Sequence, residues 1–487
     1  MSPRPSLRLF AAGVLAVVVA LAVVGWTFLD DDPEATPAVE QPQEWAFVTE
    51  PDLSAPYIDV SRYAVDGATP ADDQLVFLAP KDGDSMTGPL IVNGEGLPVW
   101  IGPDERAYDL RVQQYEGEPV LTWWRGDTVT PYYGAGEFVL VDSSYEEVAT
   151  VTTHGVMRAD YHEMTLTDEG TALLIGHRLV RRDLTDRGGS RRSWVADGIV
   201  QEVDVATGEV LFEWSALEHI PIGQAMVGLR AYGSGDSRTD PYDFAHLNSV
   251  TEDGDDAFLI SARNTSAVYR VDRDTGAVQW TLGGKASDFT MAGDSEFYWQ
   301  HDAQRQADGT ITLFDNEAAP PKAKRSRGLR LTLDMATRTA RVATEYLPPD
   351  RRLSGSQGNL QVMPNGHVFV GWGSRHYYSE YTADGELLLD GDFGTGESYR
   401  SYRFPWVGRP AEPPTLTLAD GTAYVSWNGA TEVAAWRFLA GADAASARDV
   451  GTIRREGFET SAEIPDEPYI AVQALDADGT VLTTVEH

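Results

Sequence analysis

The chain has 487 residues, of which 10% are aromatic, and it contains 46 glycines and 27 prolines. This length is too great for one ordinary hydrophobic core, but a closed repeat fold accommodates it, and the many turn-forming residues favour a β protein. The formal net charge of −37 argues against nucleic-acid binding through phosphates, and the absence of cysteine excludes disulfides, thiolate catalysis and Cys-based zinc sites.

An apolar stretch at residues 9–29 follows Arg4 and Arg8 and ends at three consecutive aspartates. About 20 apolar residues span a bilayer, and positive charge before the span with acid after it places the bulk of the chain outside the cell. We therefore predict for residues 1–29 a transmembrane helix that anchors an extracytoplasmic globular part in the cell membrane. A cleaved signal peptide, which would give a secreted protein, is the alternative, although its apolar core is usually shorter, roughly 7–15 residues.

Residues 30–50 are acidic and rich in Pro and Ala, which is typical of a linker. Beyond them, short strand-like segments alternate with Gly, Asp and Asn turns in six units, at residues 74–100, 109–151, 161–214, 246–284, 301–346 and 358–392. Full units hold four strand-like segments, and four antiparallel strands repeated at roughly 40–55 residues indicate propeller blades. The first unit lacks its first strand, which the segment YRSYRFPW at residues 399–406 would supply. We predict an all-β fold, with a six-bladed β-propeller over residues 51–410; a solenoid is the alternative.

The third unit is longer than the others, and we expect its insertion at residues 180–198 and 223–240, which are charged, Gly-rich and without strand pattern. Past about residue 410 the repeat stops. Residues 411–487 contain about seven strand-like segments, and the alternation in YIAVQALD favours a small antiparallel β-sandwich similar to a fibronectin type III domain. Nothing in this last part of the sequence indicates catalysis.

Three of the nine histidines, His162, His246 and His301, each precede a turn glycine by eight residues. The first strand of each propeller blade lines the central channel, so we expect these rings to converge. Asn248 lies two residues beyond His246, hence on the same strand face, and Arg263 places a cation in an otherwise apolar segment. Imidazole, amide and guanidinium N–H groups suit the oxygens of a tetrahedral oxyanion. An imidazole can also attack sulfur or phosphorus and hold the group covalently, while another protonates the departing oxygen.

Two other interpretations of the three histidines stay open at this point. The rings can be hydrogen-bonded packing residues, or they can hold zinc or iron. Arg263 argues against a metal, because a fixed cation repels the ion and no matched carboxylate is evident beside each ring. The residues alone do not single out one histidine as a nucleophile.

The segments TWWRG, YHEM, DFAHLNS, LISARNTSAVYRVD, WQHDA, LFDN and SQGNLQVMPNGHVFVGWGS together resemble the arylsulfotransferase family, and more narrowly its membrane-anchored or secreted actinobacterial-type branch. The resemblance covers roughly residues 50–410. It implies a six-bladed propeller that moves a sulfuryl group from a phenolic sulfate ester to an acceptor phenol, without a nucleotide sulfate donor. We expect neither a metal nor another cofactor.

By the same resemblance, His301 becomes transiently sulfated, His162 and His246 bind the sulfuryl group and handle protons, and Asn248 and Arg263 hold its oxygens. The sequence departs from the enterobacterial members, which carry a separate N-terminal β domain and a disulfide. A non-catalytic extracellular propeller that binds a ligand or partner and a His-cluster metalloenzyme remain the alternatives. The segment VDRDTGAVQW also resembles the blade motif of quinoprotein dehydrogenases, but six units in place of eight and the lack of cysteine count against that family.

Overall fold

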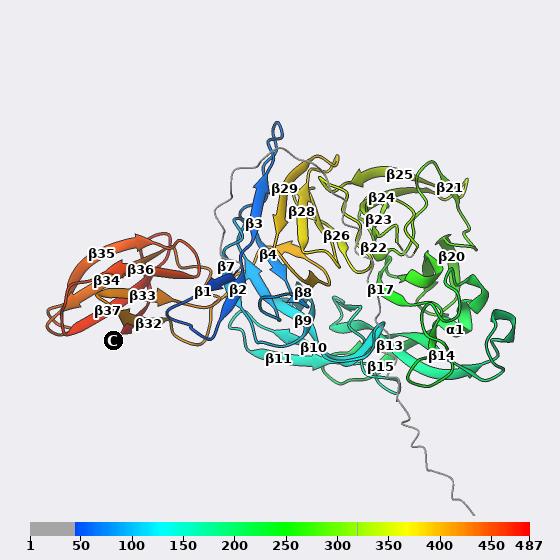
Figure 1. Cartoon of the computed structure of the whole chain (residues 1–487), viewed down its shortest axis with the longest axis horizontal. Coiled ribbons are helices and arrows are strands. Elements are labelled where there is room, and N and C mark those ends of the chain that lie inside the picture. The colour runs from blue at the N-terminus through cyan, green and yellow to red at the C-terminus, as the bar shows by residue number, and fades with distance from the viewer. Residues whose placement is uncertain (1–43, 319) are drawn as a thin grey trace, which may run out of the picture. The chain divides into compact units, whose positions relative to one another are not determined.

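The computed structural model describes residues 44–318 and 320–487, and these form an all-β protein (Figure 1). Helical structure in these residues is limited to α1 (Ala216–His219) and three 3-10 turns, Thr185–Arg187, Ile222–Gln224 and Arg263–Thr265. No helix within this part of the chain is long and apolar enough to cross a membrane. The transmembrane helix predicted for residues 1–29 and most of the predicted linker lie outside the described residues.

Six sheets of the described part are each built around four antiparallel strands. The first contains β31 (Tyr402–Phe404), β4 (Leu75–Leu78), β6 (Leu90–Val92) and β7 (Pro98–Ile101). The second contains β8 (Ala107–Tyr115), β9 (Glu118–Thr130), β10 (Tyr133–Val141) and β11 (Glu147–Val151). The third contains β12 (Met164–Leu166), β13 (Thr171–Arg182), β14 (Ser193–Asp204) and β15 (Val210–Ser215).

The other three sheets repeat this pattern. The fourth contains β17 (Leu247–Glu252), β18 (Ala257–Ala262), β19 (Ala267–Asp272) and β20 (Val278–Gly283). The fifth contains β22 (His301–Arg305), β23 (Ile311–Asp315), β24 (Arg327–Asp334) and β25 (Thr339–Tyr346). The sixth contains β26 (Asn359–Val362), β27 (Val368–Gly371), β28 (Tyr377–Tyr381) and β29 (Leu387–Asp392). Three further strands extend these sheets: β16 (Tyr242–Asp243) the third, β21 (Thr290–Ala292) the fifth and β3 (Asp59–Arg62) the sixth.

Strand β31 pairs with β4 in antiparallel register, Tyr402 opposite Phe77 and Phe404 opposite Leu75. This pairing confirms the prediction that residues 399–406 supply the first strand of the first unit. Strand β3 likewise pairs with β29, so that the blue and yellow strands lie side by side in Figure 1. The two ends of the repeat region are therefore joined by backbone hydrogen bonds.

Each of the six sheets shares an apolar core with the next. Inner strands such as β18 are buried along their whole length, whereas the outer strand β25 contains buried, half-buried and exposed residues. This pattern arises where sheets stack face to face and only the outer edge meets water. Phe314 of the fifth sheet packs with Leu360 of the sixth, and Phe369 of the sixth packs with Val76 of the first. The resulting architecture is propeller-like.

The expected insertion in the third unit is only partly present. Strands β13 and β14 form one long hairpin that pairs from Thr171–Asp204 out to Arg182–Ser193, so the prediction of an irregular segment at residues 180–198 was wrong for much of its length. Val180 and Val195 lie opposite each other and continue the strand pattern between the charged residues. Residues 223–240, in contrast, contain no strand in the described structure, as expected.

The C-terminal residues of the described chain form two sheets around one core. One contains β32 (Thr415–Ala419), β33 (Thr422–Ser426) and β36 (Glu459–Glu463); the other contains β35 (Arg448–Arg454), β34 (Ala435–Gly441), β37 (Tyr469–Leu475) and β38 (Val481–Glu486). Val425 of the first and Trp436, Phe438 and Val472 of the second lie in this core. Two short pairs complete the inventory: β1 (Glu44–Ala46) with β2 (Ser54–Pro56), and β5 (Pro80–Lys81) with β30 (Glu397–Ser398). Strand β1 falls within residues 30–50, which were predicted to be a linker.

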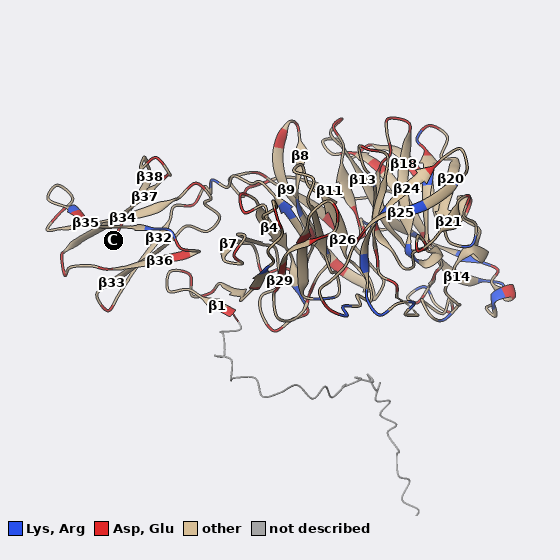
Figure 2. Cartoon of the chain, turned by 90° about the horizontal axis from the view of Figure 1, so that it is seen from above, with Lys and Arg blue, Asp and Glu red and all other residues tan. Residues whose placement is uncertain are grey.

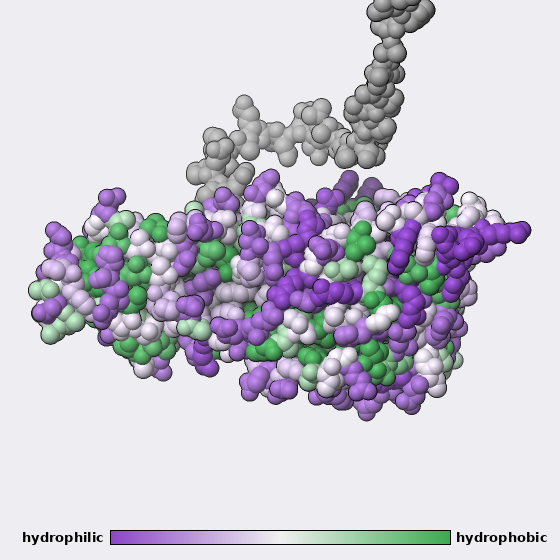
Figure 3. Space-filling model, turned by 90° about the horizontal axis from the view of Figure 1, so that it is seen from below, coloured by the Kyte–Doolittle hydropathy of each residue, from purple (hydrophilic) through white to green (hydrophobic). Residues whose placement is uncertain are grey.

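Charged side chains occupy two kinds of place. Figure 2 shows acidic residues along many loops and strand ends, where water solvates them, and Figure 3 shows hydrophilic and apolar side chains interspersed over one face.

A second group of charged side chains is buried where the sheets meet. Arg400 is fully buried, and its guanidinium lies 2.9 Å from Glu163 and 3.3 Å from Asp109. Arg111 lies 2.6 Å from Glu163, and Asp302 is 4.0 Å from Arg400. Asp109 and Arg111 lie in β8 and Asp302 lies in β22, whereas Glu163 and Arg400 stand just before β12 and β31. The network therefore ties four sheets together.

We expect Arg400→Met to lower the free energy of unfolding by about 3–5 kcal/mol, because Asp109 and Glu163 would be left buried with an incomplete set of cations. Urea unfolding of the purified protein measures the change. Arg409→Met is the control, since Arg409 forms an exposed pair with Glu432 at 2.6 Å, and we expect it to leave the stability unchanged. Equal destabilisation in the two variants would contradict the role assigned to Arg400.

Candidate active site

The structure brings the three predicted histidines to the inner ends of neighbouring sheets. His162 and His246 stand just before β12 and β17, and His301 is the first residue of β22. All three side chains are buried. The rings of His162 and His246 meet edge to face, with centroids 4.6 Å apart. The common repeat position therefore corresponds to a common place in the fold.

A cavity of about 230 Å³ lies beside these rings. His162, Arg263 and His301 line it, whereas His246 and Asn248 are not part of its wall. Aromatic and charged side chains form much of the remaining wall, among them Lys81, Tyr108, Tyr132, Tyr161, Glu397 and Tyr399. The cavity thus combines imidazole and guanidinium groups at one place with several phenol rings around them.

His162 is held by a carboxylate that precedes it by two residues. Its Nδ1 lies 2.5 Å from Oδ2 of Asp160, and Oδ1 of Asp160 accepts hydrogen bonds from the backbone N–H groups of Gly134 and Tyr161, both at 2.8 Å. Burial raises the pKa of Asp160 to about 7, whereas burial and the positive charge of Arg263 lower the pKa of His162 to about 3. Near neutral pH the pair therefore combines a neutral imidazole with a carboxyl group that gains and loses a proton.

His246 has the same kind of partner. Its Nδ1 lies 2.5 Å from Oδ2 of Asp243, and its backbone N–H donates to Oδ1 of the same residue at 3.0 Å. His162 and His246 are therefore each accompanied by a carboxylate, and the prediction that these rings lack one was wrong. The carboxylates stand two and three residues before their histidines, and this unequal spacing hides them from a repeat search. Among the described residues, no group of three or more His, Asp and Glu side chains is arranged to hold a metal ion.

His301 is set apart by neutral partners. Its Nδ1 lies 2.7 Å from Oδ1 of Asn316 and 3.1 Å from the carbonyl oxygen of Trp299. Both partners are acceptors, so Nδ1 carries the proton and Nε2 carries the lone pair. Nε2 accepts a hydrogen bond from the backbone N–H of Gln357 at 3.1 Å. Burial and the charge of Arg263 hold the pKa of His301 well below its ordinary value, so the ring is neutral and nucleophilic at physiological pH.

Arg263 directly follows β18 and opens a 3-10 turn. Its guanidinium lies beside two aromatic rings that contact each other, 4.9 Å from the centroid of Tyr232 and 4.7 Å from that of Trp299. Its Nε donates to Oδ1 of Asn264 at 3.2 Å, but one terminal nitrogen is buried without a hydrogen-bond partner. No described carboxylate lies within ion-pair distance of it. Burial lowers the pKa of Arg263, and the charge of Asp243 opposes this shift from beyond ion-pair distance. A guanidinium stays charged in such surroundings, so the cavity contains a positive charge without an ion-pair partner.

The other cations of the cavity wall are compensated. Lys81 is paired with Glu397, and Arg106 lies 2.8 Å from Asp82. Arg263 is therefore the cation in this cavity that would bind an anionic ligand.

Asn248 lies near the histidines but is not among the residues that line the cavity. A β-bulge between Leu247 and Ser249 shifts the strand register at this residue. The amide nitrogen of Asn248 donates to the carbonyl oxygen of Gln300 at 2.7 Å, directly before His301. Its contact therefore orients the start of β22, outside the cavity wall.

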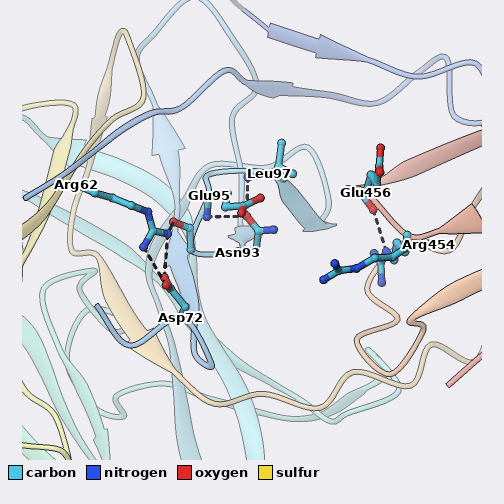
Figure 4. A pocket seen from close by; sticks show the side chains of 10 residues that line it. Arg62, Asp72, Asn93, Glu95, Leu97, Arg454 and Glu456 are labelled. Carbon is cyan, nitrogen blue, oxygen red and sulfur yellow. Dashed lines mark hydrogen bonds and ion pairs between the residues drawn. The ribbon is translucent and has the colours of Figure 1, made fainter. Parts of the chain in front are cut away.

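A larger cavity, of about 580 Å³, lies at another place in the molecule (Figure 4). Its wall contains Arg62, Asn93, Glu95 and Arg454, and none of the predicted site residues. Arg62 is paired there with Asp72 at 2.9 Å, as the dashed lines in Figure 4 show. This cavity lacks the histidines. Its Arg455 has no carboxylate partner in the described part of the chain either, but it donates hydrogen bonds to the carbonyl oxygens of Ala430 and Gly457. The smaller cavity, which contains the histidines, is therefore the candidate active site.

Several solved structures are similar to the chain. A protein of unknown function from Bacteroides caccae shares 11% identity and covers 68% of this chain and 98% of its own, with a TM-score of 0.41. Virginiamycin B lyase from Staphylococcus aureus shares 8% identity over 76% of this chain and 97% of its own, with a TM-score of 0.35. The Dos1 propeller shares 11% identity over 69% of this chain and 70% of its own, with a TM-score of 0.30.

No curated protein matches the sequence. A family model does: the model of the arylsulfotransferases (ASST) matches residues 111–394. The matched region contains His162, His246, Arg263 and His301, and it runs from the second sheet through the sixth. Because the match extends over more than half of the chain, the protein belongs to the arylsulfotransferase family.

Proposed function

We propose that the protein is an aryl-sulfate sulfotransferase that moves a sulfuryl group from a phenolic sulfate ester to an acceptor phenol through a sulfohistidine at His301. The observation that carries this proposal is the cavity in which a neutral imidazole and the unpaired guanidinium of Arg263 lie together. Family membership supplies the reaction class and the phenolic substrates. A nucleotide sulfate donor has no place in this scheme.

The charge of the cavity favours a sulfate ester over a phosphate ester. One guanidinium balances the single negative charge of an aryl sulfate. A phosphate monoester carries about two negative charges at neutral pH, because its second pKa is about 6. With Lys81 and Arg106 already paired, the second charge would be buried without a partner, which is costly.

In the first half-reaction, Nε2 of His301 attacks the sulfur in line with the aryl oxygen. The N–S bond forms as the S–O bond to the ring breaks, and the electron pair leaves on the phenolate oxygen. Arg263 holds sulfuryl oxygens, and Tyr108, Tyr132 and Tyr161 hold the aryl ring. The cavity is smaller than the roughly 300–1,000 Å³ of typical ligand pockets, so donor and acceptor occupy it in turn. A covalent intermediate keeps the sulfuryl group in place between the two.

The Asp160–His162 pair supplies and takes up the proton. Because Nδ1 of His162 faces Asp160, its Nε2 is left for the cavity. The proton on Nε2 moves to the leaving phenolate, while the carboxyl proton of Asp160 moves to Nδ1, so the imidazole stays neutral. In the second half-reaction the same path runs backward and removes the proton from the acceptor phenol, which takes the sulfuryl group from His301.

This scheme predicts a pH dependence of the first half-reaction. With the pKa of Asp160 at about 7, the pair is protonated below that pH and loses its proton above it. For a donor with a weakly acidic phenol, we expect the burst rate to fall by up to about tenfold per pH unit above pH 7. Rapid-mixing measurements of the burst test this. Asp160→Asn removes the exchangeable proton, and its burst rate should not change over that range; an unchanged profile in this variant would contradict the relay.

The assay for the function itself uses p-nitrophenyl sulfate with and without an added phenol. We expect a stoichiometric burst of p-nitrophenol alone and sustained release, together with a sulfated acceptor, when phenol is present. A non-catalytic binding propeller would give neither signal.

We also propose a domain organisation and a cellular location for the protein. The six sheets, the shared cores and the β31–β4 pairing support a closed six-bladed propeller at residues 51–410, with a fibronectin-like sandwich at residues 411–487. Residues 1–29 would anchor it as in the actinobacterial-type branch, with the globular part outside the cell. Protease treatment of intact cells tests this location, because a chain protected from the protease would contradict it.

A further inference from the structure

The backbone N–H of Gln357 contacts the atom that we propose as the nucleophile. It donates to Nε2 of His301 at 3.1 Å, and Gln357 lines the same cavity. In this hydrogen bond, the Nε2 lone pair that would attack sulfur accepts the proton of the Gln357 N–H. The donor is also within reach of any group that becomes attached to Nε2.

The backbone of Gln357 is fixed by the same side chain that orients the imidazole. Asn316 accepts from Nδ1 of His301 through its Oδ1 and donates to the carbonyl oxygen of Gln357 through its Nδ2 at 3.0 Å. Gln357 has a φ of 66°, which an L-residue adopts only under constraint. Gly373 has no side chain and therefore leaves space for this conformation. A Cβ at position 373 would lie 2.5 Å from the carbonyl carbon of Gln357.

The side chain of Gln357 provides a second attachment. Its Nε2 donates to Oε1 of Glu397 at 2.7 Å, and Glu397 is paired with Lys81. These two residues lie opposite each other in the short β5–β30 pair. The backbone at Gln357 is therefore held through its carbonyl oxygen and through its side chain. A positive φ at an L-residue persists where the surrounding structure enforces it.

We infer that the peptide N–H of Gln357 is an oxyanion donor for the transferred sulfuryl group. This inference rests on the proposed function. At rest the N–H holds the lone pair of His301 toward the cavity. When the N–S bond forms, Nε2 no longer accepts a hydrogen bond, and the fixed N–H donates to a sulfuryl oxygen instead. The aryl oxygen leaves with the electron pair of the broken S–O bond, and the Nδ1 proton stays between His301 and Asn316. A donor already in place stabilises the developing charge without reorganisation.

An ester substitution tests the N–H alone. Lactic acid introduced at position 357 by nonsense suppression replaces the N–H with oxygen, and Gln357→Ala is the matched control, because both lack the glutamine side chain. We expect the burst of p-nitrophenol from p-nitrophenyl sulfate to be about 10²- to 10³-fold slower in the ester form than in Gln357→Ala. Binding of benzenesulfonate, which cannot react, should be equal in the two, because the N–H contacts His301 until the transfer begins.

The outcomes separate the two proposals. Equal burst rates in the ester form and in Gln357→Ala would overturn the inference and leave the proposed function standing. The absence of a burst in the unmodified protein would overturn both. If the ester form does not fold, a crystal structure of the unmodified protein trapped with an aryl sulfate decides. We expect the nitrogen of Gln357 within about 3.2 Å of a sulfuryl oxygen, and a separation beyond about 3.5 Å would overturn the inference.

Discussion

His301→Ala is expected to reduce sulfuryl transfer by about 10⁴- to 10⁶-fold, a loss comparable to the removal of a covalent nucleophile from other enzymes. The imidazole is buried and neutral, and two acceptors on Nδ1, Oδ1 of Asn316 and the carbonyl oxygen of Trp299, keep the lone pair on Nε2. His162 is tied to Asp160 through Nδ1 and serves the proton transfer instead. The burst amplitude and the steady-state rate with p-nitrophenyl sulfate and phenol measure the effect.

His154→Ala is the control for this variant, because His154 is exposed and is not part of the cavity wall. We expect it to retain the activity of the unmodified protein. The nucleophile assignment fails if His301→Ala still gives a burst of one equivalent, whatever its rate.

Arg263→Met should change activity and stability in opposite directions. We expect kcat/KM to fall by about 10²- to 10³-fold, since the sulfuryl oxygens lose their charged donor. The free energy of unfolding should rise by about 1–3 kcal/mol, because the substitution removes a buried cation without a carboxylate partner and leaves an apolar chain beside Tyr232 and Trp299.

The kinetics of p-nitrophenyl sulfate turnover and urea unfolding, measured on the same preparation, test this pair of effects. Arg330→Met is the matched control, since Arg330 lies outside the cavity and pairs with Asp308 at 2.7 Å. We expect no change in its activity. Loss of both activity and stability in Arg263→Met would show that Arg263 is a structural residue and would contradict its role as the anion partner.

The features that could be predicted best from the sequence are those that recur in each repeat unit. The position eight residues before a turn glycine correctly predicted that His162, His246 and His301 lie at equivalent places, and the four-strand units correspond to observed sheets. The pairing of residues 399–406 with the first unit followed from the one strand that this unit lacked. Periodicity works here because each unit buries the same faces against its neighbours.

Contacts between different units left little trace in the sequence. Arg400 was not predicted as a central residue, because its partners Asp109 and Glu163 come from two other sheets. Asn248 was placed by alternation, which fails at a β-bulge. Gln357 acts through a backbone N–H that almost every residue possesses, so its side chain gives no signal. The special surroundings of His301 depend on such contacts, and the residues alone therefore favoured none of the three histidines.

The intact mass of the protein after brief exposure to p-nitrophenyl sulfate tests the central claim most directly. We predict an added mass of one sulfuryl group in the unmodified protein, located on the peptide that contains His301, removed by added phenol and absent from His301→Ala. An unmodified mass throughout turnover, or a sulfuryl group that persists in His301→Ala, would contradict the sulfohistidine mechanism.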